Sequence, residues 1–237
     1  MLGAYRAVRG WKTLLSREQL AKMIDHSLLH PSLTTGDIEK GCAEAMRYRF
    51  AAMVVNPAHI SITARALQGS PVKVCSVISF PFGLSPPEVK AQEAKAVLGV
   101  GAQEIDMVIN FSALRSGHPD IVQSDIKAVV SEARRFPKDI IVKVILENCY
   151  LSEEQKKQAC ILAAQAGADY VKTSTGFGTG GATVEDVRLM RKTVGKELGV
   201  KAAGGIRTLE QALAMIEAGA NRIGTSAGVS IIEALKS

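Results

Sequence analysis

The sequence predicts an α/β protein with the architecture of a (β/α)8 TIM barrel, in which eight parallel strands close into a ring inside a layer of helices. Three observations predict this fold. Short runs rich in Val and Ile alternate along the whole chain with Ala-, Glu- and Lys-rich helical stretches, as repeated βαβ units require. The length of 237 residues is close to the roughly 250 residues of one such barrel. Hydrophobic residues make up 47% of the chain and aromatic residues only 5%, which suits a buried parallel sheet covered by Ala-rich helices.

The strands are predicted at the short apolar runs. These runs span residues 23–29, 51–55, 72–78, 104–109, 139–146, 168–173, 199–203 and 221–225. Because each run is followed by a helical stretch, the strands are expected to be parallel. A doubly wound open sheet is the alternative, but no G-x-G-x-x-G pattern follows the first strand.

The helices are predicted between these runs, at residues 34–48, 57–68, 86–100, 119–135, 152–166, 183–198, 208–218 and 226–236. Ser152, followed by two glutamates, has the pattern of an N-cap. Four glycines each follow a helical pattern, where a left-handed backbone ends a helix at little steric cost: Gly101, Gly167, Gly199 and Gly219. The phrases AGADYV, LGVKAA and AGANRI repeat one device, a helix end that leads directly into a strand.

A single domain is predicted over residues 1–237, with residues 1–20 as a short N-terminal helical extension. No Pro-, Gly- or Ser-rich linker divides the chain. Arg6, Arg9 and Lys12 are scattered among the apolar residues of the extension, so it lacks the apolar core of a signal peptide. This composition also fits an organellar transit peptide, but a short amphipathic helix before the barrel is the simpler interpretation.

Charge and composition narrow the class of ligand. The net charge of +6, from 29 basic and 23 acidic residues, favours anionic ligands. No Lys/Arg block or basic patch with interleaved aromatic residues is present, so a phosphorylated small molecule is favoured over nucleic acid. The four cysteines form no C-x-x-C pair, which is typical of reduced thiols in a cytoplasmic protein. No apolar run approaches the roughly 18 residues of a membrane span.

Lysines in apolar strands are the first candidates for chemistry, because barrel active sites lie at the carboxyl ends of the strands. Four lysines interrupt the predicted strands: Lys73, Lys143, Lys172 and Lys201. Each could equally have a structural or surface role. Lys172 differs because a segment rich in hydroxyls and glycines, from Thr173 to Gly181, follows it. Small residues let backbone N–H groups approach a ligand, and hydroxyls such as that of Thr173 can donate to phosphate oxygens.

Lys201 is predicted to be the neighbour of Lys172, because it ends the next strand and adjacent strands lie about 4.7–4.9 Å apart. Two like charges at this distance lower the pKa of an ammonium group. A free lysine has a pKa of about 10.4, whereas an amine nucleophile needs one of about 7–8. The pair therefore indicates Schiff-base chemistry. Two unrelated lysines, one of them paired with a carboxylate, are the alternative.

Asp106 is the predicted carboxylate of the site. Glu104, Asp106 and Asn110 share one face of their strand, and apolar residues occupy the other face. The polar face is expected to point into the barrel, where a carboxylate needs a cationic or hydrogen-bonding partner. Asp106 is therefore expected either to transfer protons with Lys201 or to form an interior salt bridge, for example with Lys143.

Glycine turns after the last two strands predict a phosphate site, since barrels often bind phosphate there. The residues concerned are Gly204, Gly205 and Arg207 after the seventh strand, and Gly224 and Ser226 after the eighth. No metal site or cofactor is predicted. His26 and His30 are four residues apart, but Pro31 and the strand-like context oppose a helical metal-binding pair. A serine hydrolase is also disfavoured, because the turn around Ser174 does not match G-x-S-x-G.

Eight motifs occur in order along nearly the whole chain: MIDHSLLHP (23–31), VVNP (54–57), KVCSVISFPFG (73–83), EIDMVIN (104–110), KVILENCYL (143–151), YVKTSTGFG (170–178), VKAAGGIRT (200–208) and NRIGTSAG (221–228). In these motifs the chain resembles the deoxyribose-phosphate aldolases. The resemblance implies reversible cleavage of 2-deoxy-D-ribose 5-phosphate to acetaldehyde and D-glyceraldehyde 3-phosphate, without a metal. It also implies a homo-oligomer, a dimer or larger.

The same resemblance implies roles for individual residues. Lys172 would form the imine with acetaldehyde, and Lys201 would lower the pKa of Lys172. With Asp106, Lys201 would also relay protons through water. Five residues match the loops that contact phosphate, with Arg207 close by: Gly176, Gly204, Gly205, Gly224 and Ser226.

The sequence departs from the family pattern at three places. Ser79 replaces a usual glycine, Phe111-Ser112 replaces a usual Ile-Gly, and Phe177 stands where some members have lysine. Two rival functions are weighed against the aldolase. One is a different barrel enzyme that acts on a sugar phosphate, in which Lys172 could be dispensable. The other is a barrel that binds a phosphorylated metabolite without turning it over.

Overall fold

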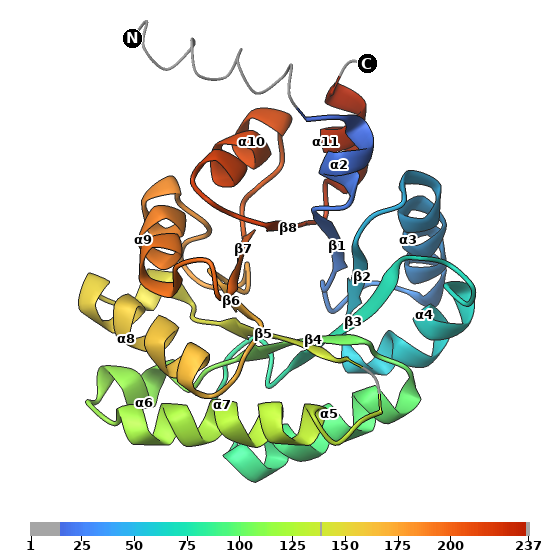
Figure 1. Cartoon of the computed structure of the whole chain (residues 1–237). Coiled ribbons are helices and arrows are strands. Elements are labelled where there is room, and N and C mark those ends of the chain that lie inside the picture. The colour runs from blue at the N-terminus through green and yellow to red at the C-terminus, as the bar shows by residue number, and fades with distance from the viewer. Residues whose placement is uncertain (1–14, 138, 236–237) are drawn as a thin grey trace, which may run out of the picture.

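The computed structural model describes residues 15–137 and 139–235, and its strands form a closed barrel (Figure 1). The order around the ring is β1 to β8, every neighbouring pair is parallel, and β8 closes on β1. The strands are β1 (Ile24–Leu28), β2 (Ala52–Val55), β3 (Lys73–Ile78), β4 (Glu104–Val108), β5 (Ile141–Ile145), β6 (Tyr170–Lys172), β7 (Gly199–Ala203) and β8 (Arg222–Thr225). The predicted fold class is therefore confirmed.

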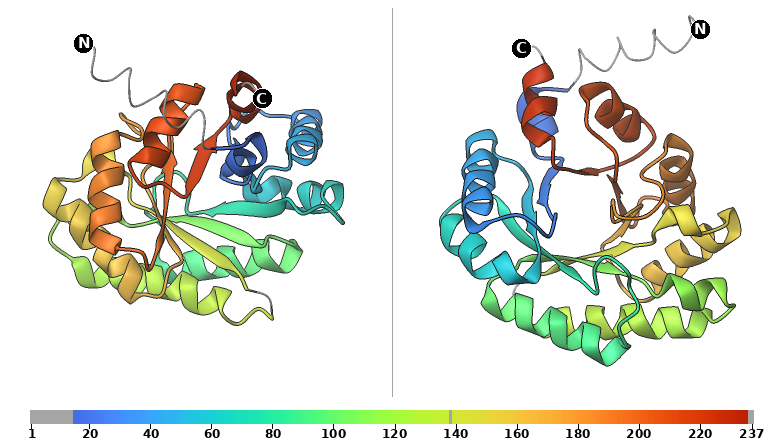
Figure 2. Two further views of the ribbon diagram at one scale, coloured as in Figure 1. Left: turned by 45° about the horizontal axis from the view of Figure 1, so that its top comes forward. Right: turned by 180° about the vertical axis from the view of Figure 1, so that it is seen from behind.

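Helices form the outer layer in all views (Figures 1 and 2). They are α2 (Arg17–Ala21), α3 (Thr35–Tyr48), α4 (Ile60–Ala66), α5 (Pro87–Val100), α6 (Phe111–Arg115), α7 (Pro119–Ala133), α8 (Glu153–Gln165), α9 (Val184–Val194), α10 (Leu209–Glu217) and α11 (Gly228–Ala234), with 3-10 turns η1 (Pro57–His59) and η2 (Asn148–Tyr150). The short elements α6 and η2 were not expected from the sequence. Both follow a strand at the end of the barrel where the predicted site lies.

One predicted helix end is wrong. The stretch predicted at 183–198 ends at Val194, and Gly195 follows it with φ 62°. Gly199 is instead the first residue of β7. A glycine is required there for a different reason, because a Cβ at Gly199 would lie 2.0 Å from a ring carbon of Tyr170. The other three glycines of this kind do follow helices and have positive φ.

The N-terminal extension predicted for residues 1–20 lies mostly outside the described residues, which begin at Leu15. The described part contains α2. Its Ser16 forms a capping box with Gln19, and Leu20 is fully buried. Helix α2 packs against α11, so the beginning and the end of the described chain meet (Figure 1).

The amino ends of three even-numbered strands are tied by one repeated side-chain bond. The residue before each of β4, β6 and β8 donates its N–H to the carbonyl of one residue in the preceding strand. Its side chain accepts the N–H of that strand residue. The three pairs are Gln103 with Val74 (2.8 and 3.2 Å), Asp169 with Val142 (2.9 and 2.7 Å), and Asn221 with Val200 (2.8 and 3.0 Å). The repeated phrases AGADYV and AGANRI supply two of these residues.

Two arginines reinforce this end of the barrel in the same way. Arg134 donates to the side chain of Asp169 and to the carbonyl of Gly167. Arg191 donates likewise to Asn221 and Gly219. These bonds fix the amino ends of the strands. The carboxyl ends, where barrel active sites lie, do not take part in them.

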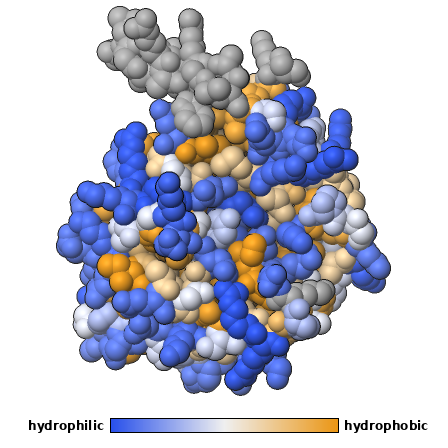
Figure 3. All heavy atoms as spheres, in the orientation of Figure 1, coloured by the Kyte–Doolittle hydropathy of each residue, from blue (hydrophilic) through white to orange (hydrophobic). Residues whose placement is uncertain are grey.

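Apolar side chains between strands and helices form the main core. Figure 3 shows hydrophilic residues over most of the periphery of one face, with hydrophobic residues in smaller patches. Inside the ring the apolar cluster is small and consists of Ala52, Val54, Cys75 and Val77. Charged side chains from β1 and from β4 to β8 fill much of the rest of the described barrel interior.

Candidate active site

Three of the four strand lysines point into the barrel. Lys143, Lys172 and Lys201 are at most 2% exposed, whereas Lys73 is exposed at the start of β3. The register of the strands pairs Lys172 with Lys201 and Asp106 with Lys143. The expected proximity of Lys172 and Lys201 is thus present.

Asp106 lies between these lysines and is fully buried. Its Oδ2 accepts hydrogen bonds from Nζ of Lys172 at 2.8 Å and of Lys201 at 2.6 Å. Its Oδ1 accepts from Nζ of Lys143 at 2.9 Å. The two arrangements that the sequence left open for Asp106, contact with Lys201 and a salt bridge with Lys143, therefore occur together.

A second layer of charges lies below, toward the amino ends of the strands. Nζ of Lys201 lies 2.6 Å from Oδ2 of Asp25, and Nζ of Lys143 lies 2.6 Å from Oε2 of Glu104. Arg222 contacts both carboxylates, Asp25 through Nε at 2.7 Å and Glu104 at 2.9 Å. Asp25 and Arg222 were not predicted as part of the site. Their inward position follows from the strand alternation, but each stands near the start of a strand, where a charge usually faces solvent.

The charges in this cluster do not balance. Among the described residues it contains three carboxylates and four basic groups. Lys143 lies within 4 Å of all three carboxylates, and Lys201 and Arg222 each contact two. Lys172 contacts Asp106 alone. The cluster becomes neutral when one basic group loses its proton, and Lys172 has the least carboxylate compensation.

The pKa shifts follow this pattern. Burial lowers the pKa of Lys172, the attraction of Asp106 opposes this, and the charge of Lys201 adds to the lowering. Burial acts on Lys201 in the same direction, but Asp106 and Asp25 outweigh it and raise its pKa. The sequence predicted that Lys201 lowers the pKa of Lys172; in the structure burial is the larger cause and Lys201 the smaller one. Lys172 is the basic group suited to act as a neutral amine.

A cavity of about 320 Å³ opens above Lys172 at the carboxyl ends of β1, β6, β7 and β8. Seven predicted site residues line it: Lys172, Gly176, Gly204, Gly205, Arg207, Gly224 and Ser226. Lys201 and Asp106 lie buried beneath its floor. The glycine-rich turns and the proposed nucleophile thus share one space.

Thr173 does not line this cavity, although the sequence suggested that its hydroxyl contacts the ligand. Its hydroxyl donates to the carbonyl of Ala203 at 2.9 Å and accepts the N–H of Ala203 at 3.0 Å. Neighbouring side chains of a strand point to opposite faces, so Thr173 faces away from the interior that Lys172 occupies. The position of Thr173 therefore supports a role in joining β6 to β7.

Gly224, inside β8, shows why this part of the site needs glycine. A Cβ at this position would lie 2.8 Å from Cβ of Ala203 and 3.0 Å from Cε of Lys201. The absence of a side chain at Gly224 therefore leaves the space through which the side chain of Lys201 reaches Asp106.

The sequence missed the part of the cavity wall that the end of β1 supplies, which includes Ser27, Leu29 and His30. Nδ1 of His30 accepts the backbone N–H of Ser32 at 3.3 Å and lies 2.7 Å from the Ser32 hydroxyl. Because Nδ1 is an acceptor, the ring proton of neutral His30 is on Nε2. The cavity wall thus contains a further hydrogen-bond donor. In the sequence, only the position of His30 within the motif MIDHSLLHP indicated a place in the site.

Two of the departures from the family pattern have clear structural consequences. Ser79 has φ 51°, in the left-handed region that favours glycine. Its N–H donates to Oε2 of Glu93 at 2.7 Å and its hydroxyl donates to that of Ser85 at 3.0 Å, and these bonds hold the conformation. Phe177 lines the cavity and packs edge-on against Phe80, with ring centroids 5.4 Å apart.

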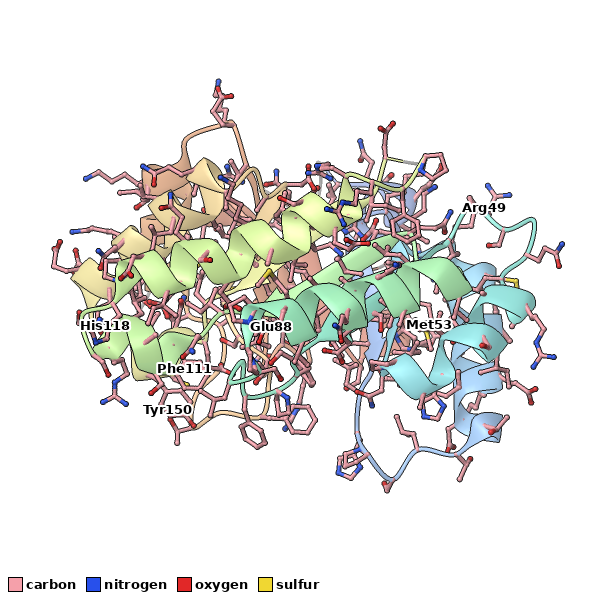
Figure 4. The ribbon with its side chains drawn as sticks, turned by 90° about the horizontal axis from the view of Figure 1, so that it is seen from below. Arg49, Met53, Glu88, Phe111, His118 and Tyr150 are labelled. Atoms are coloured by element: carbon pink, nitrogen blue, oxygen red, sulfur yellow. The ribbon has the colours of Figure 1, made fainter. Side chains whose placement is uncertain are left out.

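At the third departure, Phe111 stacks on Tyr150 with ring centroids 5.2 Å apart, and the two rings lie side by side in Figure 4. Phe111 starts α6 and Tyr150 ends η2. The two short elements that the sequence did not predict are therefore packed together.

None of the described helices is long and apolar enough to cross a membrane. No group of three or more His, Cys, Asp or Glu side chains in residues 15–137 and 139–235 is arranged to hold a metal ion.

Comparison with known proteins agrees with the geometry of the site. Residues 19–234 match the model of the DeoC/LacD family aldolases. The chain is 61% identical over 216 residues to a deoxyribose-phosphate aldolase of Thermococcus gammatolerans, covering 90% of this chain and 95% of that one. It is 54% identical to one of Carboxydothermus hydrogenoformans, covering 94% and 98%. A tetrameric deoxyribose phosphate aldolase from Aeropyrum pernix superposes with a TM-score of 0.87 at 37% identity, covering 94% and 93%.

The matched range, residues 19–234, contains all eight strands, the charge cluster and the residues that line the cavity. We conclude that the chain belongs to the DeoC/LacD family of aldolases, among the deoxyribose-phosphate aldolases.

Proposed function

We propose that the protein reversibly cleaves 2-deoxy-D-ribose 5-phosphate to acetaldehyde and D-glyceraldehyde 3-phosphate through an imine on Lys172, without a metal ion. The observation that carries this proposal is the position of Lys172. It lines the floor of the cavity, and it is the basic group of the interior cluster with the fewest carboxylate contacts. A neutral amine facing a cavity of this size is suited to attack an aldehyde carbon.

The reaction starts when the neutral amine of Lys172 attacks C1 of the open-chain substrate. Loss of water from the carbinolamine gives the iminium ion, which withdraws electrons from C2. Removal of the proton from the C3 hydroxyl then lets the C2–C3 bond break, giving glyceraldehyde 3-phosphate and an enamine on Lys172. Protonation of the enamine at C2 and hydrolysis release acetaldehyde.

Asp106 and Lys201 are proposed to move the protons in these steps, through water. Asp106 Oδ2 contacts both lysine nitrogens, so it can stabilise the charge on Lys172 as the iminium forms. Lys201 has a raised pKa because of Asp106 and Asp25, although burial opposes the increase. It is therefore suited to remain protonated and to act as the acid of the pair.

The phosphate is proposed to bind at the turns after β7 and β8. Gly204, Gly205, Gly224 and Ser226 all line that part of the cavity, and their small size lets backbone N–H groups approach phosphate oxygens. Arg207 and His30 line the same cavity and supply donors at its edge. Thr173 is proposed to support the strand pair instead of contacting substrate.

The remaining expectations extend this proposal. We propose one domain that acts in the cytoplasm without a cofactor and assembles into a homo-oligomer. The tetramer formed by the related Aeropyrum pernix protein supports the last point. The small-molecule substrates explain the basic balance of the chain without a nucleic-acid partner.

Reductive trapping tests the proposal. Borohydride reduction in the presence of acetaldehyde should add about 28 mass units, an ethyl group in place of one hydrogen, to the peptide that contains Lys172. Lys172→Leu should remove both the adduct and the cleavage of deoxyribose 5-phosphate, while Lys73→Leu keeps both. Activity that survives in Lys172→Leu would refute the imine mechanism. Activity that EDTA abolishes would refute metal independence.

A further inference from the structure

Glu147 is a buried carboxylate that the proposed mechanism does not use. It follows β5, is 2% exposed, and has a left-handed backbone with φ 57°. Both of its carboxylate oxygens lie 3.3 Å from the backbone nitrogen of Thr175, which donates its N–H to them. The Thr175 hydroxyl also donates to Oε2 of Glu147. One side chain at the end of β5 thus binds the loop after β6 at two points.

The contact continues into the cavity wall. The N–H of Phe177 donates to the Thr175 hydroxyl at 3.0 Å, so Thr175 connects Glu147 to Phe177. Thr175, Gly176 and Phe177 all line the cavity. The conformation of this three-residue wall therefore depends on the carboxylate of Glu147.

The next part of the loop packs directly on the same carboxylate. A Cβ at Gly178 would lie 3.2 Å from Cδ of Glu147 and 2.8 Å from Sγ of Cys149. The loop therefore approaches Glu147 as closely as a glycine allows. The contact is a packed one, with no room for a side chain at Gly178.

Lys172 is held by other bonds. The N–H of Leu146 donates to the carbonyl of Lys172 at 2.9 Å, and the N–H of Asn148 donates to that of Thr173 at 3.0 Å. Lys172 is also paired with Lys201 on β7. These backbone bonds do not involve the side chain of Glu147, so the nucleophile and the cavity wall have separate supports.

We propose that Glu147 is a positioning residue that holds the Thr175–Phe177 wall in place for the phosphorylated substrate, without taking part in imine formation. The inference rests on the proposed function. A buried N–H that loses its acceptor is costly, so the Thr175 segment is expected to move when Glu147 is truncated. Gly176 then no longer meets the substrate in the right place, while Lys172 stays where the strands hold it.

The test compares three variants with the wild type. Glu147→Ala should raise KM for deoxyribose 5-phosphate by on the order of 10- to 100-fold, as displacement of a substrate-positioning group does. Its kcat and its rate of borohydride trapping with acetaldehyde should change less than about threefold, by the same separation of binding from chemistry. Glu147→Gln, which can still accept the Thr175 N–H, should recover most of the lost affinity. Glu197→Gln, the same type of change at an exposed glutamate before β7, should match the wild type.

Local hydrogen exchange supplies a second measurement. Amides of the peptide that covers residues 173–181 should exchange faster in Glu147→Ala, and those of β7 should not. Thr175→Val removes the hydroxyl that donates to Glu147 and accepts the Phe177 N–H. Its effect on KM should not add to that of Glu147→Ala, because both changes break the same support. This variant also decides the matter if Glu147→Ala does not fold.

The outcomes are distinct. If the wild type itself does not cleave deoxyribose 5-phosphate, the proposed function fails. If the wild type is active and Glu147→Ala has an unchanged KM, or loses trapping as much as binding, the positioning role is refuted. The role is also refuted if Glu147→Gln is as impaired as Glu147→Ala, because the charge and not the hydrogen-bond acceptor would then be what matters.

Discussion

Nζ of Lys201 lies 2.6 Å from Oδ2 of Asp25, a carboxylate that does not line the cavity. Together with Asp106, this carboxylate raises the pKa of Lys201, although burial acts in the other direction. Lys172 has no such second partner in the described cluster, and burial lowers its pKa. The pKa values of two lysines on adjacent strands are thus shifted in opposite directions, downward by burial at Lys172 and upward by two carboxylates at Lys201.

Lys201→Met should therefore change the protonation of Lys172 as well as remove an acid. Without the charge of Lys201, the pKa of Lys172 rises toward its usual value, so a smaller fraction is neutral at pH 7.5. Turnover should fall by on the order of 10²- to 10⁴-fold. The acidic limb of the pH–rate profile for trapping with acetaldehyde should move to higher pH. Lys73→Met is the matched control, and an unmoved limb in Lys201→Met would contradict the account of the paired lysines.

His30→Ala should weaken the binding of the phosphorylated substrate selectively. The proton on Nε2 of His30 is available in the wall of the cavity that also contains the phosphate turns. Loss of one exposed hydrogen bond should raise KM for deoxyribose 5-phosphate by about 3- to 10-fold. The KM for unphosphorylated deoxyribose should not change. His118→Ala, an exposed histidine outside the cavity lining, is the control. Equal effects on the two substrates would show that His30 does not contact the phosphate.

Lys90→Met should destabilise the protein in a pH-dependent way. Lys90 Nζ is fully buried and donates to Asp125 Oδ2 at 2.7 Å and to the carbonyl of Val108 at 2.8 Å. Removal of one partner of a buried pair costs about 3–5 kcal/mol. The pKa of Asp125 is already raised by burial, against the attraction of Lys90, and it rises further in the variant. The loss is therefore greatest at neutral pH and shrinks in acid, where the carboxyl is protonated.

Urea unfolding of Lys90→Met between pH 4 and pH 8 measures this loss. Lys95→Met, an exposed change on the same helix, should stay within about 0.5 kcal/mol of the wild type. A loss in Lys90→Met that is the same at every pH would show that the charge of Asp125 is not its cause.

His26 should make stability depend on pH near neutrality. Its ring is 2% exposed, lies 5.3 Å from the ring of Phe50, and has an Nδ1 without a hydrogen-bond partner in the described structure. Burial lowers the pKa of His26, with Glu44 opposing the shift. The unfolded chain, with a histidine pKa of about 6.5, therefore binds more protons than the folded one just below that pH. Stability should fall as the pH drops through this range.

Unfolding measured between pH 5 and pH 8 tests the role of His26. His26→Gln should flatten the slope of the free energy of unfolding against pH, since glutamine does not titrate. A slope that is unchanged in this variant would assign the dependence to other groups.

The strands and the central trio were predictable because two simple rules act there. Adjacency of consecutive strands brings Lys172 and Lys201 together, and alternation along β4 turns Asp106 into the same barrel interior. The same alternation places Thr173 on the outer face of the barrel. The predicted ligand contact of Thr173 was based on the hydroxyl-rich motif and did not take this alternation into account.

Other parts of the site depend on contacts that no local pattern carries. Glu147 binds a loop 28 residues away in the sequence, and Arg222 reaches Asp25 across 197 residues. The cause of the lowered Lys172 pKa was also only partly predictable. Repulsion between lysines follows from their spacing, whereas the larger effect of burial depends on how completely the barrel closes around them.

The paired bonds at the amino ends of the strands act on alternate strand pairs. The bonds of Gln103, Asp169 and Asn221 join β3 to β4, β5 to β6 and β7 to β8. A chain cut between these pairs keeps each of these side-chain bonds within a single fragment. It would still break backbone bonds, because the carbonyls of Gln103 and Asp169 accept the N–H groups of Ile141 and Gly199 on the next strand. The side-chain bonds therefore add support to every second strand pair from β3 onward, on top of the backbone pairing that runs around the whole ring.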